Sequence, residues 1–223
     1  MAARSYGQYC GLTAAVELVA ERWALLIIRD LLVGPRRYTD LKQGLPKIPT
    51  NILSARLREL QRGAVIRRVP LAGGGVVYEL TEYGQELEPI VLALGRWGFR
   101  SMGDPKAGDI VTAASLTMAL HTAFRPGRAS TGLDFQIKVG DVELRGQVSN
   151  GDLNVFQIAP PAPPLGGDPP TGEPELWFSS GSGIRDLIAG ALTATQSVEN
   201  GEITIRKGGI NELERFAELF RIA

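Results

Sequence analysis

Apolar residues recur at helical spacing through most of the first hundred positions, and one β-rich stretch interrupts them. Such spacing predicts amphipathic helices, whereas short runs of branched residues between glycines predict strands. In order, we expect two helices between residues 11 and 33, a short helix at 38–43, a helix at 49–61, a hairpin of 65–71 and 76–80, and a long helix capped by Thr81. A helical cluster that carries a hairpin is typical of a winged helix-turn-helix; the alternative is any small α+β domain with a basic face.

The pattern changes beyond the short polar segment 101–108, which is typical of a linker. The sequence then predicts a helix at 116–124, strands at 133–139, 142–148, 153–158 and 176–178, a helix at 184–192 capped by Ser182, a strand at 202–206, and a helix at 213–220 opened by Asn211 and Glu214. Seven of the fourteen prolines stand at 159–175 and predict an exposed loop, with a PxxP ligand at 160–163 as the alternative.

Together these elements predict an α+β chain of two domains. The first, at 1–102, is a winged helix-turn-helix domain for DNA binding and dimerisation. The second, at 109–223, is an α/β sandwich built on an antiparallel sheet.

Composition narrows the class of protein. With 44% apolar residues, a chain of 223 residues can form two packed cores. No apolar run reaches the roughly 18 residues of a membrane span, and the N-terminus lacks a signal peptide's apolar region, so we expect a cytoplasmic protein that does not contact a membrane. One cysteine and one histidine exclude an internal disulfide and a His/Cys zinc site. We expect neither cofactor nor metal ion.

Charge is unevenly distributed along a chain whose formal net charge is zero. Residues 29–68 hold ten Lys or Arg against three Asp or Glu, a formal charge of +7 (10 − 3). Residues 1–105 sum to +4 (14 − 10), and residues 106–223 to −4 (10 − 14). A local basic surface supplies much of a protein's sequence-independent affinity for DNA, so we expect the first half to bind double-stranded DNA.

The predicted helix at 49–61 has two different faces on a helical wheel. On a wheel of residues 50–62, one side carries Leu53, Leu57 and Leu60. Opposite them lie Asn51, Ala55, Arg58 and Arg62, with Ser54 beside them. A recognition helix needs this division, because leucines anchor it while polar side chains enter the major groove. Asn51 can bond adenine, Arg58 can bond guanine, and Thr50 and Ser54 can reach a base or a phosphate. The alternative is an ordinary amphipathic surface helix.

Other basic residues stand where phosphates pass in helix-turn-helix complexes, before the short helix, in the turn, and on the wing. We expect phosphate contacts from Arg36, Arg37, Lys47, Arg62 and one of Arg67 and Arg68, which alternate along a strand. Arg56 lies nearer the buried face. Its side chain is expected to pack, with its guanidinium on a phosphate or on an internal carboxylate such as Glu59 or Asp40.

Several motifs of the first half occur together in a known order. They are Cys10, Arg22–Leu31 (RWALLIIRDL), Gly34–Leu41 (GPRRYTDL), Ile48–Leu60 (IPTNILSARLREL), Tyr78–Gly84 (YELTEYG) and Trp97-Gly98. Over residues 8–100 the chain closely resembles the HxlR family, bacterial winged-helix transcription regulators related to the MarR regulators. The resemblance implies a homodimer, formed largely through the terminal helices of the domain, that binds a pseudo-palindromic operator.

The chain departs from the family pattern at three places. Glu21-Arg22 stands where Gly and Lys are usual, and the wing tip is Gly-rich instead of Pro-containing. Pro49 stands where Ser or Thr usually caps the recognition helix, so capping passes to Thr50 or is lost.

Cys10 occupies the position of the cysteine that some family members use as a redox or electrophile sensor. With one cysteine per chain, sensing needs an intersubunit disulfide or an adduct. The alternative is a small buried packing residue, the more usual place of a free cysteine.

The second half resembles the sterol-carrier-protein family of the second type, at the level of pattern. The resemblance rests on the strands around Asn150–Asp152, on Ile203–Ile205 and on Leu213–Phe220. It implies a helix-covered sheet around an apolar cavity for lipid-like molecules. Candidate liners are Met118, Phe124, Phe135, Trp177, Ile188, Phe216 and Phe220. The alternative is that each of these residues packs in the hydrophobic core without contacting a ligand.

Three functions are therefore compatible with the sequence. The first is a dimeric transcription regulator whose second domain binds a hydrophobic small-molecule effector or only extends the dimer. The second is an enzyme, but no nucleophile elbow, phosphate loop or paired carboxylate accompanies His121, and Ser180–Gly183 is better explained as a strand-to-helix turn, so we expect no catalytic residue. The third is a lipid-binding module with a non-functional winged helix. This function does not explain the formal charge of +7 over residues 29–68.

Overall fold

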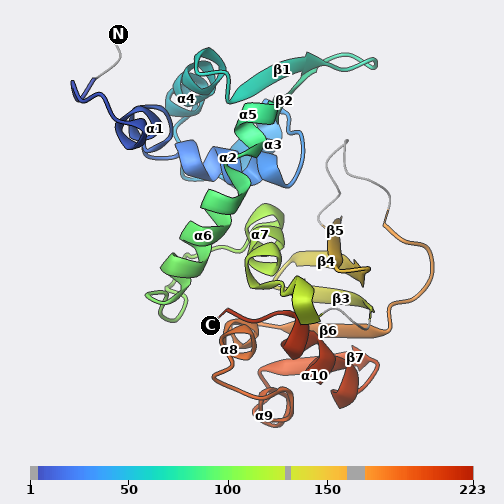
Figure 1. Cartoon of the computed structure of the whole chain (residues 1–223). Helices are drawn as coiled ribbons and strands as arrows, with labels where there is room; N and C mark the ends of the chain where they lie inside the picture. The colour runs from blue at the N-terminus through green and yellow to red at the C-terminus, as the bar shows by residue number, and fades with distance from the viewer. Residues whose placement is uncertain (1–4, 129–131, 160–168, 223) are drawn as a thin grey trace. The chain divides into compact units, whose positions relative to one another are not determined.

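The computed structural model describes residues 5–128, 132–159 and 169–222. The chain divides into two compact units, Met1–Val91 and Leu92–Ala223 (Figure 1). The division falls inside helix α6 (Glu88–Phe99), before the polar segment that the sequence marks as a linker. The reason is packing, because Val91 contacts the core of the first unit whereas Phe99 contacts that of the second. The predicted boundary at 102 therefore differs from the observed one.

The first unit is a cluster of short helices with a two-stranded hairpin. Its elements are α1 (Gly11–Val19), α2 (Ala24–Leu32), α3 (Tyr38–Gly44), α4 (Thr50–Arg62), β1 (Ile66–Pro70), β2 (Val76–Leu80), α5 (Glu82–Gln85) and the start of α6. The apolar faces of α2 and α4 form the core, where Ile27, Leu53 and Leu57 are almost completely buried. The predicted order of helices and hairpin is confirmed.

Two details of the first unit differ from the prediction. Trp23, which apolar spacing with Leu26 and Ile27 had placed in the second helix, precedes α2, because the turn after α1 places its backbone in the left-handed region (φ 82°). The long helix expected after the hairpin is two helices. Thr81 caps only α5, since its Oγ1 accepts a hydrogen bond from the Gly84 amide at 3.1 Å, and a second helix, α6, begins at Glu88.

The second unit packs helices against a five-stranded sheet (Figure 1). After α6 its elements are α7 (Ala113–Ala123), the 3₁₀ turn η1 (Pro126–Arg128), β3 (Leu133–Val139), β4 (Val142–Ser149), β5 (Asp152–Ala159), β6 (Leu176–Ser180), α8 (Gly183–Ala189), α9 (Ala194–Glu199), β7 (Ile203–Lys207) and α10 (Ile210–Leu219). The strand order is β5-β4-β3-β6-β7, and β3 pairs with β6 in parallel. The expected purely antiparallel sheet is wrong, because apolar alternation predicts a strand but not its direction.

The helices of the second unit also correct the sequence prediction. Helix α9 had no counterpart in the apolar pattern. Ser182 precedes α8 without a side-chain capping bond. The last helix begins earlier than predicted, at Ile210, where Glu212 Oε2 accepts a hydrogen bond from the Gly209 amide at 2.8 Å in place of the expected pair of Asn211 and Glu214. The PxxP segment 160–163 lies outside the described residues.

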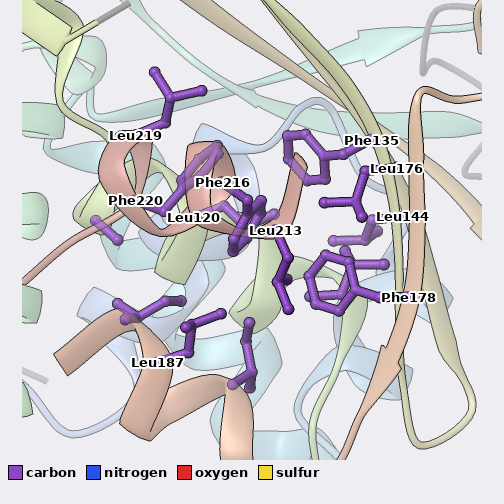
Figure 2. Close-up of a cluster of buried hydrophobic side chains, with 14 of the residues drawn as sticks. Leu120, Phe135, Leu144, Leu176, Phe178, Leu187, Leu213, Phe216, Leu219 and Phe220 are labelled. Carbon is purple, nitrogen blue, oxygen red and sulfur yellow. The ribbon is translucent and has the colours of Figure 1, made fainter. Parts of the chain in front are cut away.

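Phenylalanine rings fill the space between the sheet and α10 (Figure 2). Phe216 stacks on Phe220 with ring centroids 4.5 Å apart, and it meets Phe135 and Phe178 edge-on at 5.0 Å. Edge-on and offset contacts at these distances stabilise aromatic clusters beyond the burial of area. Phe135 lies over Gly146 of the neighbouring strand, where a Cβ would stand 2.1 Å from the ring. Glycine is therefore required at that position of β4.

Candidate nucleic-acid interface

Helix α4 presents the two faces that its sequence predicts. Leu53, Leu57 and Leu60 are buried in the first core. The opposite face is polar and open: Thr50, Asn51, Arg58 and Arg62 are exposed, while Ser54 and Ala55 are half-buried. A helix anchored by leucines and displaying an amide, hydroxyls and guanidinium groups has the form and the chemistry to enter a major groove.

The first turn of α4 is held from outside the helix. Pro49 occupies the capping position and provides no side-chain bond, so the capping function of the usual Ser or Thr is lost. Tyr38, on the first turn of α3, reaches across instead. Its hydroxyl donates to the Thr50 carbonyl oxygen at 2.9 Å and lies 3.2 Å from Ser54 Oγ. These contacts fix α3 against the part of α4 where base contacts are expected.

The ten basic residues of segment 29–68 divide into two groups. Six are exposed, namely Arg37, Lys47, Arg58, Arg62, Arg67 and Arg68, and of these Arg67 also pairs with Glu79. The other four are engaged within the unit: Arg29, Arg36, Lys42 and Arg56. The formal charge of +7 therefore overstates the charge that the segment offers to a partner. The exposed basic residues lie on α4, on the turns around α3, and on the wing.

Arg36 belongs to a buried charge cluster and not to the surface. Its side chain is mostly covered, with the residue 8% exposed, and its backbone exchanges hydrogen bonds with Tyr78 of β2 at 2.9 and 2.7 Å. Burial lowers the pKa of Arg36, while attraction to Asp30 and Asp40 opposes that shift. The predicted phosphate contact of Arg36 is therefore wrong, because a side chain that is almost completely covered does not reach a phosphate.

Asp30 is the other member of that cluster. It is 2% exposed, and its Oδ1 accepts hydrogen bonds from Arg29 Nε and Nη2 at 2.9 and 2.6 Å. Burial raises its pKa, and the charges of Arg29 and Arg36 oppose the rise. A carboxylate at this depth needs both cations, because an unpaired buried charge is costly.

Arg56 joins α4 to its surroundings. Its guanidinium pairs with Glu59 one turn along the helix and lies 3.6 Å from Glu21, with 16% of the side chain exposed. The sequence left a phosphate and an internal carboxylate open for this residue, and the contact with Glu59 supports the internal one.

The wing carries both predicted arginines on its exposed surface, whereas alternation along the strand had led us to expect one. Arg67 Nε bonds Glu79 Oε1 at 2.6 Å, so a carboxylate offsets its charge. Arg68 lies over the neutral ring of Tyr78 at 5.9 Å. Arg37 extends toward the wing tip, because a Cβ on Gly75 would lie 3.3 Å from its Nη1.

Cys10 is exposed at the start of α1, so its interpretation as a buried packing residue is wrong. Hydrogen bonds from the backbone of Thr13 and of Leu12 lower the pKa of its thiol, since amide dipoles at a helix N-terminus favour the thiolate. The role of a sensor stays a prediction.

Most of the residues proposed to line an apolar cavity are packed in the hydrophobic core of the second unit. Phe135, Phe216 and Phe220 are fully buried against one another, Phe124 meets Phe220 at 5.7 Å, and Met118 on α7 and Ile188 on α8 are buried. Trp177 alternates with Leu176 and Phe178, so its side chain lies on the opposite face of the sheet with 36% exposed. Its assignment as a liner beside the rings is therefore wrong.

Within the described ranges, no helix combines the length and apolar character needed to cross a membrane. The same residues contain no group of three or more His, Cys, Asp or Glu placed to hold a metal ion.

Comparison with known proteins places the first unit in a family. Residues 18–105 match the model of the HxlR-like helix-turn-helix family. The HTH-type transcriptional regulator YvaP of Bacillus subtilis is 34% identical over 85 residues, which are 37% of this chain and 79% of YvaP. The regulator sll1512 of Synechocystis is 34% identical over 94 residues, 41% of this chain and 70% of its own.

The solved structure of a putative HTH-type transcriptional regulator, ytcD, is 34% identical and covers 41% of this chain and 96% of its own, with a TM-score of 0.40. All of these matches fall short of half the present chain. On the sequence matches, the chain belongs to the HxlR-like helix-turn-helix family.

Proposed function

We propose that this HxlR-type regulator reads operator bases with the exposed face of α4 and holds the DNA backbone with basic residues around it. The observation that carries the proposal is the division of α4, whose leucines are buried while Asn51 and Arg58 are exposed. Asn51 would bond adenine N6 and N7, and Arg58 would bond guanine O6 and N7. Both lie in the family segment, residues 18–105.

Phosphate contacts are proposed for the exposed bases that flank this face. They are Arg37, Lys47, Arg62, Arg67 and Arg68, with Thr50 as a hydroxyl contact to a base or a phosphate. Because Glu79 offsets Arg67, Arg68 contributes more of the wing's attraction for DNA. Such contacts position the protein without choosing a sequence.

The test compares one base-reading residue with one phosphate-holding residue. The operator is first selected from randomised duplexes, and Arg58→Ala and Arg62→Ala, one helical turn apart, are then titrated against single-base variants of it. Arg58→Ala should lose discrimination at one base pair, by about 1–3 kcal/mol. Arg62→Ala should weaken all duplexes alike. Equal, sequence-independent losses in both variants would contradict base reading by α4.

A second copy of the chain is the proposed partner for the apolar residues that α6 leaves open. Ile90, Leu94 and Trp97 are exposed and lie on one side of that helix, and Leu12 is exposed on α1. A two-fold dimer would cover them and match a two-fold operator. Sedimentation should give a dimer for the wild type and for Glu88→Lys, which lies across the helix, and a monomer for Leu94→Lys. A monomeric wild type would contradict this part of the proposal.

For the second unit we propose a packed domain that extends the regulator. The contacts between Phe135, Phe216 and Phe220 support this, because rings 4.5–5.2 Å apart leave no room among themselves for a ligand. A hydrophobic effector, the alternative, would have to displace them. Calorimetric titration with a long-chain fatty acid should show no saturable binding, and a saturable isotherm abolished by Phe216→Trp would favour the effector.

A further inference from the structure

The hydroxyl of Tyr38 fixes the direction of a hydrogen bond on the recognition helix. It lies 2.9 Å from the Thr50 carbonyl oxygen and 3.2 Å from Ser54 Oγ. A carbonyl oxygen can only accept, so the single phenolic proton goes to Thr50. The phenolic oxygen then faces Ser54 as an acceptor. Ser54 Oγ must therefore donate its own proton to Tyr38.

This arrangement determines what Ser54 can offer to DNA. A serine hydroxyl has one proton and two acceptor lone pairs, and here the proton is already used. Ser54 is half-buried in the stripe between Thr50 and Arg58, both exposed. Toward the groove it can only accept. Phosphate oxygens, guanine O6 and N7, and thymine O4 are acceptors too, whereas adenine N6 and cytosine N4 are donors.

Resting on the function proposed above, we infer that Ser54 is a specificity-determining residue that accepts a hydrogen bond from the amino group of adenine or cytosine, and that Tyr38 is the positioning residue that makes it an acceptor. The sequence alone allowed Ser54 to contact either a base or a phosphate, as hydrogen-bond donor or acceptor. An acceptor base facing Ser54 meets a lone pair, or it binds only if the bond between Tyr38 and Ser54 breaks. Discrimination against guanine and thymine at that position should be roughly 5- to 10-fold.

The hydroxyl of Tyr38 can be removed without removing its ring. Its ring side chain bridges α3 and α4, and Phe in its place keeps the ring while removing only the hydroxyl. The first turn of α4 has no side-chain cap, since Pro49 precedes it, so the hydroxyl is a polar tie between that turn and α3. Removing it frees the Ser54 proton for an outside acceptor.

The test uses the full chain and four variants: Tyr38→Phe, Ser54→Ala, the double variant, and Tyr83→Phe. Tyr83, on α5 with 55% exposed, controls for loss of a phenol away from α4. Each protein is titrated against the selected operator and all its single-base substitutions. We expect the wild type and Tyr83→Phe to prefer adenine or cytosine at one position. Ser54→Ala should lose that preference, and Tyr38→Phe should admit guanine or thymine there. The double variant should behave as Ser54→Ala.

The inference is overturned if Tyr38→Phe leaves every base preference unchanged, whether or not it weakens binding uniformly. It is equally overturned if Ser54→Ala keeps the wild-type preferences. The same holds if the preference that Ser54→Ala removes is a preference for guanine or thymine. These outcomes leave the proposed function intact, because the protein still selects an operator. A wild type that selects no duplex sequence contradicts the proposed function itself.

Discussion

Arg36 and Arg37 are adjacent in sequence, but their replacement by methionine should have different effects. Arg36→Met should lower the free energy of unfolding, whereas Arg37→Met should weaken DNA binding. Methionine retains most of the aliphatic stem of arginine, so the substitution chiefly removes the charge. Arg36 is 8% exposed beside Asp30, whereas Arg37 is exposed and extends toward the wing tip. Arg37 contributes to α3 through its backbone amide, which donates to Asp40 Oδ2 at 2.8 Å, and that bond survives the substitution.

The magnitude for Arg36→Met follows from the carboxylate it leaves behind. Removing one partner of a buried ion pair typically costs about 3–5 kcal/mol, which is an upper bound here because Arg36 acts on Asp30 through the attraction of its charge, whereas Arg29 also donates hydrogen bonds. Asp30 keeps its two hydrogen bonds from Arg29, at 2.9 and 2.6 Å, so the loss should lie below that range, at about 2 kcal/mol. Arg37→Met should change the free energy of unfolding by less than about 0.5 kcal/mol, as surface substitutions usually do.

DNA binding should show the reverse order. Removing one cation from a phosphate reduces the slope of log K against log salt by about 0.9. Arg37→Met should lower the slope by about that amount per bound chain, and Arg36→Met, assayed where it is folded, should leave it unchanged. Urea unfolding followed by circular dichroism and salt-dependent fluorescence anisotropy measure the two effects. The reasoning is refuted if Arg37→Met destabilises as much as Arg36→Met, or if folded Arg36→Met shows the reduced slope.

Three further predictions concern stability. Gly146→Ala should cost about 1–3 kcal/mol, because its Cβ would stand 2.1 Å from a buried phenylalanine ring, whereas Gly181→Ala, with open space around it, should be nearly neutral in the same denaturation assay. Phe178→Ala should cost about 3–5 kcal/mol, and Trp177→Ala, from the other face of the sheet, clearly less; equal losses would contradict the assigned faces. Burial raises the pKa of Asp30, so the carboxyl's contribution to stability is complete below its unfolded pKa of about 3.9 and is lost as pH rises through the higher folded pKa. The stability of the wild type relative to Asp30→Asn should therefore fall as pH rises from about 4 through the raised folded pKa of Asp30, and a difference independent of pH would count against a raised pKa.

The sequence predicted the features that depend on local pattern. Leucine spacing identified α4 and its two faces, and glycines between β-rich runs identified the wing. The helical wheel placed Arg56 nearer the buried face but left its guanidinium partner open between a phosphate and an internal carboxylate, and the structure pairs it with Glu59. The burial of Arg36 was missed because nothing local distinguishes it from Arg37. Its position depends on Asp30 of helix α2 and on a backbone bridge to Tyr78 of strand β2.

The second unit was harder to predict, because its arrangement also depends on contacts between residues far apart in the sequence. Alternation identified its strands, but the parallel pairing of β3 and β6 depends on how the chain crosses between them. Apolar spacing marked Trp177 and Phe178 alike, although neighbouring strand residues face opposite sides of a sheet. The bond between Tyr38 and Ser54 joins two helices and leaves no mark in the sequence of either.

We propose that the exposed face of α4 and the basic residues around it bind DNA. The decisive measurement is the affinity of the full chain for its selected operator across a range of salt concentrations. We expect log K to fall linearly with log salt, with a slope of about −0.9 for each phosphate contacted and therefore several times that value in total, because several exposed Lys and Arg residues release counterions from phosphates. Absence of binding, or binding that does not weaken as salt rises, would contradict it.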